Sequence, residues 1–138
     1  MFSIGNKCVT IKYRYKNDDG LWPLMIDPQT IRGIVNRIKA RRQSWRVSRR
    51  SKNTVLVSIL AVDQSEILDI IFRELSWRDY SYGPIMDDHQ PPRPGDIWVF
   101  SLAISGIDCY LKFQDKPSGV VMWISIHPIE HPLNLPYK

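Results

Sequence analysis

Three side chains near the end of the chain, those of Tyr110, Lys112 and His127, have the types and spacing that acid–base chemistry needs. Tyr110 and Lys112 are two residues apart, so a β-strand would place both on one face of a sheet. His127 lies in the following stretch, where the same period of two places it on one face with Ser125 and Trp123. A base, a cation and an acid on adjacent strands suit RNA cleavage without a metal. The base would deprotonate the 2′-hydroxyl, the cation would hold the phosphate, and the acid would protonate the leaving 5′-oxygen.

The same residues also have interpretations that involve no catalysis. Tyr110 would be an aromatic core residue, Lys112 a charged residue at a sheet edge whose stem covers apolar surface, and His127 a residue that ends a strand. The pattern leaves both interpretations open, because perturbed titratable groups become visible only in a structure.

Other kinds of catalytic site lack their signatures in this sequence. His127 and His131 are four residues apart, but Pro128 and Pro132 exclude the helix that would align them as metal ligands. The sequence contains no glycine-rich phosphate loop and no Gly-x-Ser-x-Gly turn. We therefore expect neither a metal ion nor an organic cofactor.

Charge is distributed unevenly along the 138 residues, whose net charge is +5. Residues 28–62 carry nine basic groups and no acidic group, whereas residues 63–138 carry six basic and eleven acidic groups. Such a basic block is typical of a surface that neutralises phosphates, and an aromatic ring within it could stack on a base. A solvated helix face, or a surface that meets an acidic partner, would have the same composition. The residues that we expect to contact RNA are Arg37, Lys39, Arg41, Arg42, Trp45, Arg46, Arg49, Arg50 and Lys52.

Two helices follow from the spacing of apolar residues and from capping signals. The first is predicted from Pro28 to about residue 42, with Asp27 as its N-cap. The second is predicted over residues 63–75, where Glu66 completes a capping box. Residues 45–48 are predicted to be extended, and residues 51–62 suit a buried strand and a buried helix equally.

The last third of the chain is predicted to be mostly strands. Residues 83–95 are rich in proline and glycine and are predicted to form a loop. The strand-like segments 97–104, 107–114 and 120–127 are separated by tight turns, which indicates a three-stranded antiparallel meander. Residues 9–16 alternate and could add a strand. The expected fold is therefore α+β, with N-terminal helices packed on an antiparallel sheet.

The length suits one domain over residues 1–138. We expect an N-terminal strand and extension over residues 1–27, a core over 28–127 and a proline-rich extended tail over 128–138. The two cysteines are far apart in apolar surroundings, and no apolar run has the length of a signal peptide or a membrane span. These features predict a cytoplasmic protein with no membrane partner.

Four short motifs resemble the motility quorum-sensing regulator (MqsR) family of toxins, relatives of the RelE-like mRNA interferases of bacterial toxin–antitoxin systems. The motifs are Asp79-Tyr80, Asp96-Ile97-Trp98, Tyr110-Leu111-Lys112-Phe113 and Ile124-Ser125-Ile126-His127. The likeness covers residues 28–127. It implies a RelE-like fold, an endoribonuclease that acts on mRNA, and a cognate antitoxin protein as partner.

The resemblance also implies roles for particular positions. The family's tyrosine falls on Tyr110, and a family lysine falls on His127, which keeps acid–base ability near neutral pH. Tyr82 stands where the family has a lysine, and Gly95 lies near the position of its glutamine, so these two positions depart from the pattern. The candidate catalytic residues are Tyr110 and His127 as an acid–base pair, Lys112 and Arg93 as phosphate-binding cations, and Tyr82.

The alternative is a non-catalytic module of a phage or mobile element that binds nucleic acid or a partner protein. Such a module would share the basic block, and its Tyr110, Lys112 and His127 would be ordinary sheet residues. Nucleic-acid binding with steep salt dependence and without cleavage would favour this alternative.

Overall fold

Helix α1 (Pro28–Ala40) begins where the sequence predicts in the computed structural model, which describes residues 26–138. The Asp27 carboxylate caps the helix by accepting a hydrogen bond from the Thr30 N–H at 3.0 Å. The strand predicted over residues 9–16 lies outside the described residues. Within residues 26–138, no helix is long and apolar enough to cross a membrane. The buried face of α1 consists of Ile31, Ile34, Val35 and Ile38.

Helix α3 (Gln64–Glu74) also confirms its prediction. The Asp63 side chain caps the first turn, and the Asp63 N–H donates in return to Glu66 Oε1 at 3.2 Å, which completes the capping box. A 3₁₀ turn, η3 (Trp77–Asp79), follows the helix and leads into the sheet.

The ambiguous segment 51–62 is helical. It forms a 3₁₀ turn, η2 (Ser51–Thr54), and helix α2 (Val55–Leu60). One side of α2 packs inward, with Leu56 fully buried, whereas Ile59 on the other side is 56% exposed. In a strand buried on both faces, Ile59 would be buried. The run of apolar residues in this segment therefore did not predict which of them are buried.

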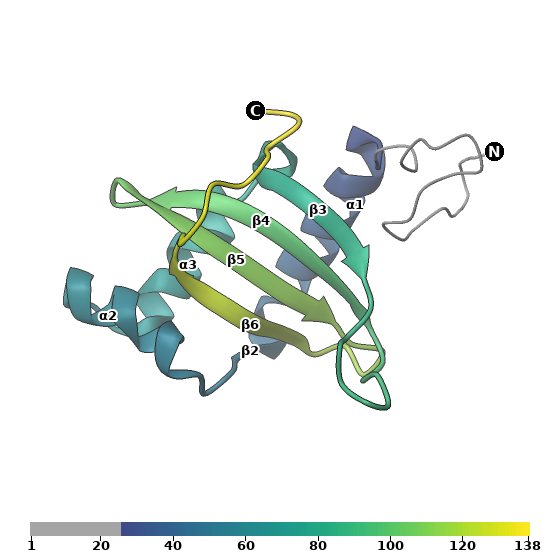
Figure 1. Cartoon of the computed structure of the whole chain (residues 1–138), viewed down its shortest axis with the longest axis horizontal. Coiled ribbons are helices and arrows are strands. Elements are labelled where there is room, and N and C mark those ends of the chain that lie inside the picture. Colours follow the sequence, from purple (N-terminus) through teal and green to yellow (C-terminus); the bar gives the residue numbers. More distant parts are fainter. Residues whose placement is uncertain (1–25) are drawn as a thin grey trace.

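The sheet has five strands in the order β2-β6-β5-β4-β3 (Figure 1). Strands β4 (Asp96–Ile104), β5 (Ile107–Asp115) and β6 (Val121–Pro128) form the predicted antiparallel meander. Strand β2 (Trp45–Val47) pairs in parallel with β6 after a 3₁₀ turn, η1 (Arg42–Ser44), so the sheet is mixed. The α+β class is as predicted.

Strand β3 (Tyr80–Ile85) corrects the prediction of a loop over residues 83–95, because the loop covers only residues 86–95. Strand β3 pairs with β4 through two register shifts. At one of them Gly83 has φ +129°, and a Cβ there would lie 2.8 Å from the Ile97 carbonyl oxygen. A glycine followed by a proline is tolerated here because β3 is an edge strand of the described sheet.

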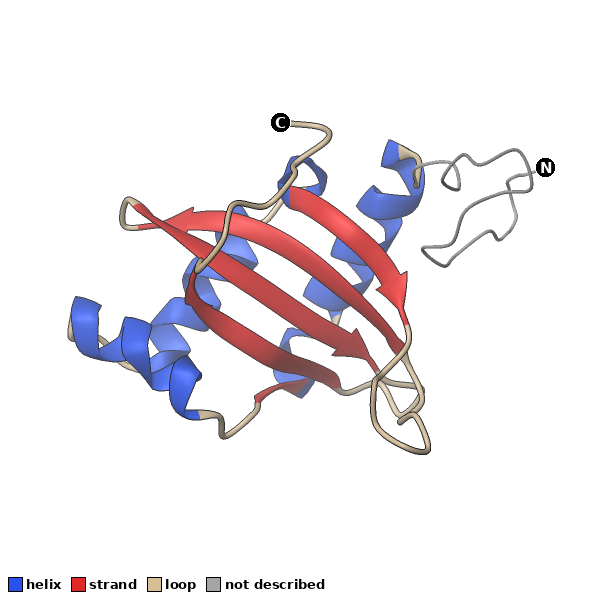
Figure 2. Ribbon diagram, viewed as in Figure 1, coloured by secondary structure: helices blue, strands red, loops and turns tan. Residues whose placement is uncertain are grey.

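Helices α1 and α3 cover one face of the sheet, and no helix formed by residues 26–138 covers the other face (Figures 1 and 2). The covered face holds the hydrophobic core, in which the Trp123 ring lies 5.1 Å from Phe113 and 4.9 Å from Trp45, measured between ring centroids. Side chains of β5 alternate between the two faces. The opposite face, which carries Tyr110, Lys112 and Gln114 of β5, is called the open face below.

The C-terminal segment ties the two ends of the described chain together. The Ile129 N–H donates to the Asp108 carbonyl oxygen at 3.0 Å, which places the start of the segment beside β5. At its end, the Tyr137 hydroxyl donates to the Ile26 carbonyl oxygen at 2.6 Å, and its ring packs 5.6 Å from Trp77. Lys138 Nζ pairs with the buried Asp79 carboxylate at 2.6 Å. The predicted extended tail is thus bound to the sheet at its start, and to Ile26 and η3 at its end.

Candidate functional site

The site begins with a row of three side chains that crosses the open face. The hydroxyl oxygens of Tyr82 on β3 and Tyr110 on β5 lie 3.4 Å apart, so the two side chains meet over the intervening strand β4. The Tyr110 ring stacks on His127 of β6, with centroids 5.3 Å apart and planes 20° apart. Three candidate catalytic residues from separate parts of the sequence therefore meet in space.

The structure corrects one expectation about this row, because Trp123 does not share its face. Lys112 pairs with Ser125, whereas the next residue, Phe113, pairs with Trp123, so β6 has an extra residue at Ile124. This bulge shifts the alternation by one residue. Trp123 consequently faces the core, while Ser125 contacts Arg50 and His127 stacks on Tyr110.

Asn53, which sequence reasoning missed, holds the bulge in place. Its Nδ2 donates to the Ile124 carbonyl oxygen at 3.0 Å, and its Oδ1 accepts from the Ile126 N–H at 2.9 Å. Nδ2 also lies 3.1 Å from the Ser48 carbonyl oxygen, and the whole residue is 3% exposed. The side chain therefore takes the place of the β2 backbone beside β6. An asparagine in a polar turn carries no sequence signal for this role.

His127 is held in one tautomer. Its Nδ1 lies 2.9 Å from the Pro128 carbonyl oxygen, and a carbonyl only accepts, so Nδ1 donates. The unprotonated nitrogen is then Nε2, which can act as a base. The residue is 7% exposed, so its ring is fixed in the sheet surface.

Tyr110 keeps its proton more firmly than an ordinary tyrosine. Burial raises the pKa of its hydroxyl above the usual value of 10.0, and the hydrogen bond with Tyr82 raises it further, although the nearby Arg50 guanidinium lowers it. At neutral pH Tyr110 is a hydroxyl donor and not a base.

Two cations approach this row. Arg50 Nη1 donates to Ser125 Oγ at 2.8 Å. Lys112 is the β5 partner of the same serine. Positive charge thus lies beside the stacked Tyr110 and His127, where a phosphate would need it.

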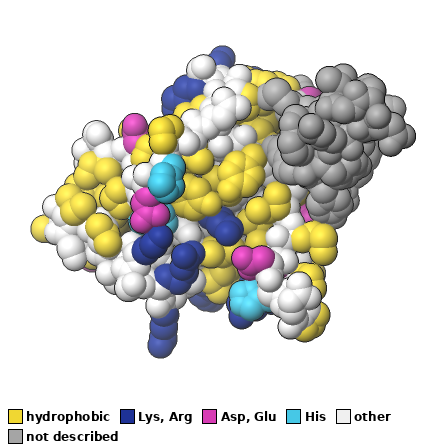
Figure 3. All heavy atoms as spheres, in the orientation of Figure 1, with side chains coloured by type: hydrophobic (Ala, Val, Ile, Leu, Met, Phe, Trp, Pro, Cys, Tyr) yellow, Lys and Arg dark blue, Asp and Glu magenta, His cyan; other side chains and the backbone are white. Residues whose placement is uncertain are grey.

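Beside the row the open face is hollowed into a cleft with a volume of about 730 Å³, called the cationic cleft below. Figure 3 shows lysine and arginine side chains gathered on this face, with histidine and acidic side chains beside them. Strand β2 and the residues after it form one wall, and the 86–95 loop forms the other. The basic residues that line the cleft are Arg49, Arg50, Arg93, Lys112 and Lys116.

The 86–95 loop is held firmly against the sheet. The buried Gln114 side chain donates through Nε2 to the carbonyl oxygens of Arg93 at 3.1 Å and Gly95 at 3.0 Å. The Asp87 carboxylate accepts from the Arg93 N–H at 2.7 Å. Gly95 is required where it stands, because a Cβ there would lie 2.6 Å from the Asp115 carbonyl oxygen. Arg93 is thereby fixed at the cleft through its backbone.

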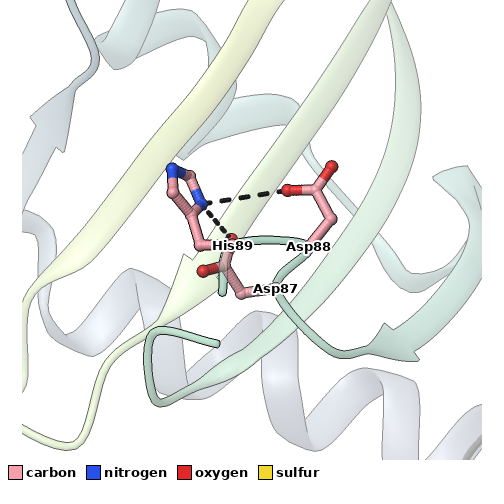
Figure 4. Close-up of side chains that lie close together, drawn as sticks. All are labelled: Asp87, Asp88 and His89. Atoms are coloured by element: carbon pink, nitrogen blue, oxygen red, sulfur yellow. Dashed lines mark hydrogen bonds and ion pairs between the residues drawn. The ribbon is translucent and has the colours of Figure 1, made fainter. Parts of the chain in front are cut away.

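Asp87, Asp88 and His89 lie close together on this loop (Figure 4). His89 Nδ1 lies 3.0 Å from Asp87 Oδ1 and 3.8 Å from Asp88 Oδ1. The hydrogen bond from the Arg93 N–H lowers the pKa of Asp87, and the hydrogen bond with the His89 side chain lowers it further. Three such groups could hold a metal ion, but the Asp88 side chain is 95% exposed, and the contacts of Asp87 are explained by its role in anchoring the loop.

The basic block does not form one surface, contrary to the interpretation as a continuous RNA-contacting segment. Arg37 and Arg41 both pair with Asp115, at 2.9 and 3.5 Å, on the helix side of the molecule. Lys39 is also on α1, and burial lowers its pKa. The block wraps around the β2 edge, and only its later part reaches the cleft. Further ion pairs join Arg42 to Asp69 and Lys52 to Glu130, and Arg46 donates to backbone carbonyls.

The prediction that Trp45 stacks on a base is also wrong, because its ring is buried. It is 4% exposed, and its indole N–H donates to the Ile38 carbonyl oxygen at 2.8 Å. The rings of Phe72 and Trp123 and the Arg42 guanidinium pack around it. Of the nine residues expected to contact RNA, Arg49 and Arg50 line the cleft.

No family model, no curated protein and no solved structure matches this chain significantly. The likeness to the MqsR family therefore stays a prediction from the four short motifs.

Proposed function

We propose that this protein is an endoribonuclease that cleaves RNA without a metal ion, as a toxin of a toxin–antitoxin system with a RelE-like fold. The stacking of Tyr110 on His127 beside two cations carries the proposal, because it joins an acid, a base and phosphate-binding groups in one place. The proposed substrate is mRNA in the cytoplasm. The proposed partner is a cognate antitoxin protein that covers the site.

In the proposed mechanism each group has a role. His127 Nε2 takes the proton of the 2′-hydroxyl, whose oxygen attacks the adjacent phosphorus. Lys112 and Arg50 stabilise the negative charge that builds on the phosphate oxygens. The P–O5′ bond breaks, and Tyr110, which holds its proton at neutral pH, donates it to the leaving 5′-oxygen. The products are a 2′,3′-cyclic phosphate and a 5′-hydroxyl.

Tyr82 supports this arrangement although it departs from the family pattern. Its hydroxyl lies 3.4 Å from that of Tyr110 and helps to keep that residue protonated. Arg93, the other proposed phosphate cation, lines the cleft from the 86–95 loop, whereas Arg50 lines it from the segment after β2. Neither residue needs a metal ion for its role.

The test incubates purified protein with single-stranded RNA in the presence of EDTA. We expect cleavage to fragments ending in 2′,3′-cyclic phosphate, and growth arrest when the protein is expressed. His127→Ala should lower the cleavage rate by a factor of about 10² to 10⁴. Tyr110→Phe should also lower the rate, but by a smaller factor. The exposed His131→Ala and the distant Tyr137→Phe are matched controls that should cleave normally. Intact RNA with normal cell growth would refute the proposal.

The cationic cleft favours a second candidate, a module that binds nucleic acid without cutting it. The charge of the cleft does not depend on His127, so it would serve such a module equally well. Salt-dependent binding of RNA that stays intact, and that is unaffected by His127→Ala, would favour this function.

A further inference from the structure

We propose that the cationic cleft is the binding site for one unpaired nucleotide adjacent to the cleaved bond, with its base on an apolar floor and its phosphate on the surrounding cations. The position of this nucleotide next to a cleaved bond rests on the proposed function. The binding site itself can be tested separately.

The floor of the cleft is apolar although the face around it is polar. Met122 and Ile124 of β6 are half-buried and line the cleft, and Ile97 of β4 lines it as well. Ile124 reaches this face because it lies two residues after Met122, whose β5 partner Gln114 is on the open face. Apolar surface at the bottom of a charged cleft suits the flat face of a nucleobase.

The cations of the cleft differ from four residues of the basic block in their partners. Within residues 26–138, none of Arg49, Arg50, Arg93, Lys112 and Lys116 forms an ion pair with a carboxylate. Arg37, Arg41, Arg42 and Lys52 are paired with acids. Five cations without a carboxylate partner thus line one cleft, where Asp87 and Asp88 are the acidic residues, so the lining keeps an excess of positive charge that a phosphate diester would neutralise.

The shape of the cleft selects an unpaired nucleotide. Its walls rise on both sides of the floor, one from the segment after β2 and the other from the 86–95 loop that Gln114 fixes. Bases in a duplex are stacked and expose only their edges, so a duplex cannot lay a base face on Met122 and Ile124. A single strand can turn one base out of the stack.

The cleft adjoins the row formed by Tyr82, Tyr110 and His127. Arg50 and Lys112 line the cleft and also flank Ser125, and Ser125 lies two residues along β6 from His127, which stacks on Tyr110. A nucleotide in the cleft would therefore have its phosphate next to the proposed acid–base pair. This proximity identifies the nucleotide as a neighbour of the cleaved bond.

The experiment uses fluorescence anisotropy with labelled 2′-O-methyl RNA, which lacks the attacking hydroxyl and reports binding alone. We expect the single strand to bind at least about tenfold more tightly than a duplex of the same sequence. Ile124→Ala should weaken binding about fivefold without changing its salt dependence, because it removes apolar contact only. Arg49→Gln should weaken binding, and it should reduce by about one the slope of the logarithm of the binding constant against the logarithm of the salt concentration.

Two matched controls accompany these variants. Ile59→Ala removes an isoleucine that is 56% exposed on α2, and Arg73→Gln removes an exposed arginine of α3 that does not line the cleft. Both should bind like the unchanged protein, and circular dichroism should show that all four variants are folded.

The outcomes separate this inference from the proposed function. Equal affinity for single strand and duplex, or an Ile124→Ala variant with unchanged affinity, would overturn the inference even if natural RNA is cleaved. If the predicted binding pattern is seen while natural RNA stays intact, the nucleotide site is supported and the proposed cleavage fails.

Discussion

The side-chain oxygen of Asn53 accepts a hydrogen bond from the backbone N–H of Ile126 at 2.9 Å, inside a part of the sheet edge where no β2 backbone remains. Asn53 also donates to the Ile124 carbonyl oxygen. One side chain thus completes the pairing of β6 on both sides of Ser125, and it fixes the bulge that turns His127 onto the open face.

Asn53→Ala should therefore destabilise the protein. The substitution leaves the buried Ile126 N–H without a partner, whereas the Ile124 carbonyl oxygen still accepts from Ser48 Oγ, so the expected cost is about 1 to 3 kcal/mol. Urea unfolding followed by fluorescence would measure the change. Asn134→Ala is the matched control, since Asn134 is exposed and contributes its backbone oxygen to Ser81 Oγ, and its effect should stay within about 0.5 kcal/mol. Equal effects of the two variants would contradict the role of Asn53.

Tyr82→Phe should lower the pKa of Tyr110. The hydrogen bond between the two hydroxyls is one cause of the raised value, so its removal makes the Tyr110 proton easier to lose. Phenolate absorbance near 295 nm, compared between proteins with and without Tyr110→Phe, would follow this ionisation. In the proposed mechanism, the loss of cleavage activity at alkaline pH should then begin at a lower pH in Tyr82→Phe. An unchanged or higher pKa would show that burial alone holds the proton.

Cys109 should be unreactive in the folded protein. Burial raises the pKa of its thiol to about 11, and the side chain is fully buried against β4 and β6. Near pH 8 the thiolate fraction is about one in a thousand, so iodoacetamide should label it slowly. The measurement uses a Cys8→Ser background, with the denatured protein as the positive control. Rapid labelling without denaturant would show that β5 opens locally.

Two glycines should respond to alanine in opposite directions. Gly33 is exposed in the middle of α1 with nothing within 4 Å of an added Cβ, so Gly33→Ala should stabilise the protein by about 0.5 to 1 kcal/mol. Gly95→Ala should destabilise it by about 2 kcal/mol or more, because its φ is +118° and its Cβ would clash with Asp115.

The control for Gly95 is Gly106→Ala. Gly106 also has a positive φ, of +81°, but an added Cβ would meet nothing within 4 Å. Its cost should be about 1 kcal/mol, which measures the backbone strain without the clash. Thermal unfolding of the three variants would rank them. A Gly95→Ala protein no less stable than Gly106→Ala would contradict the packing of the 86–95 loop on β5.

The sequence by itself determined the local elements. Caps at Asp27 and Asp63, and tight turns between apolar alternating segments, act within a few residues of the chain, so α1, α3 and the β4–β6 meander could be predicted from them. The pairing of Tyr110 with Lys112 on one face of β5 followed from the period of a strand.

Only the tertiary structure decided which residues meet at the site. The bulge at Ile124 separates His127 from Trp123, and it depends on Asn53, which is 71 residues away along the chain. The partners of each basic residue were equally invisible in the sequence: Arg37 meets Asp115 on the far side of the sheet, whereas Arg50 meets Ser125 on the open face. The reason is physical, because hydrogen bonds and ion pairs depend on distances of a few ångströms that the packing of distant segments sets.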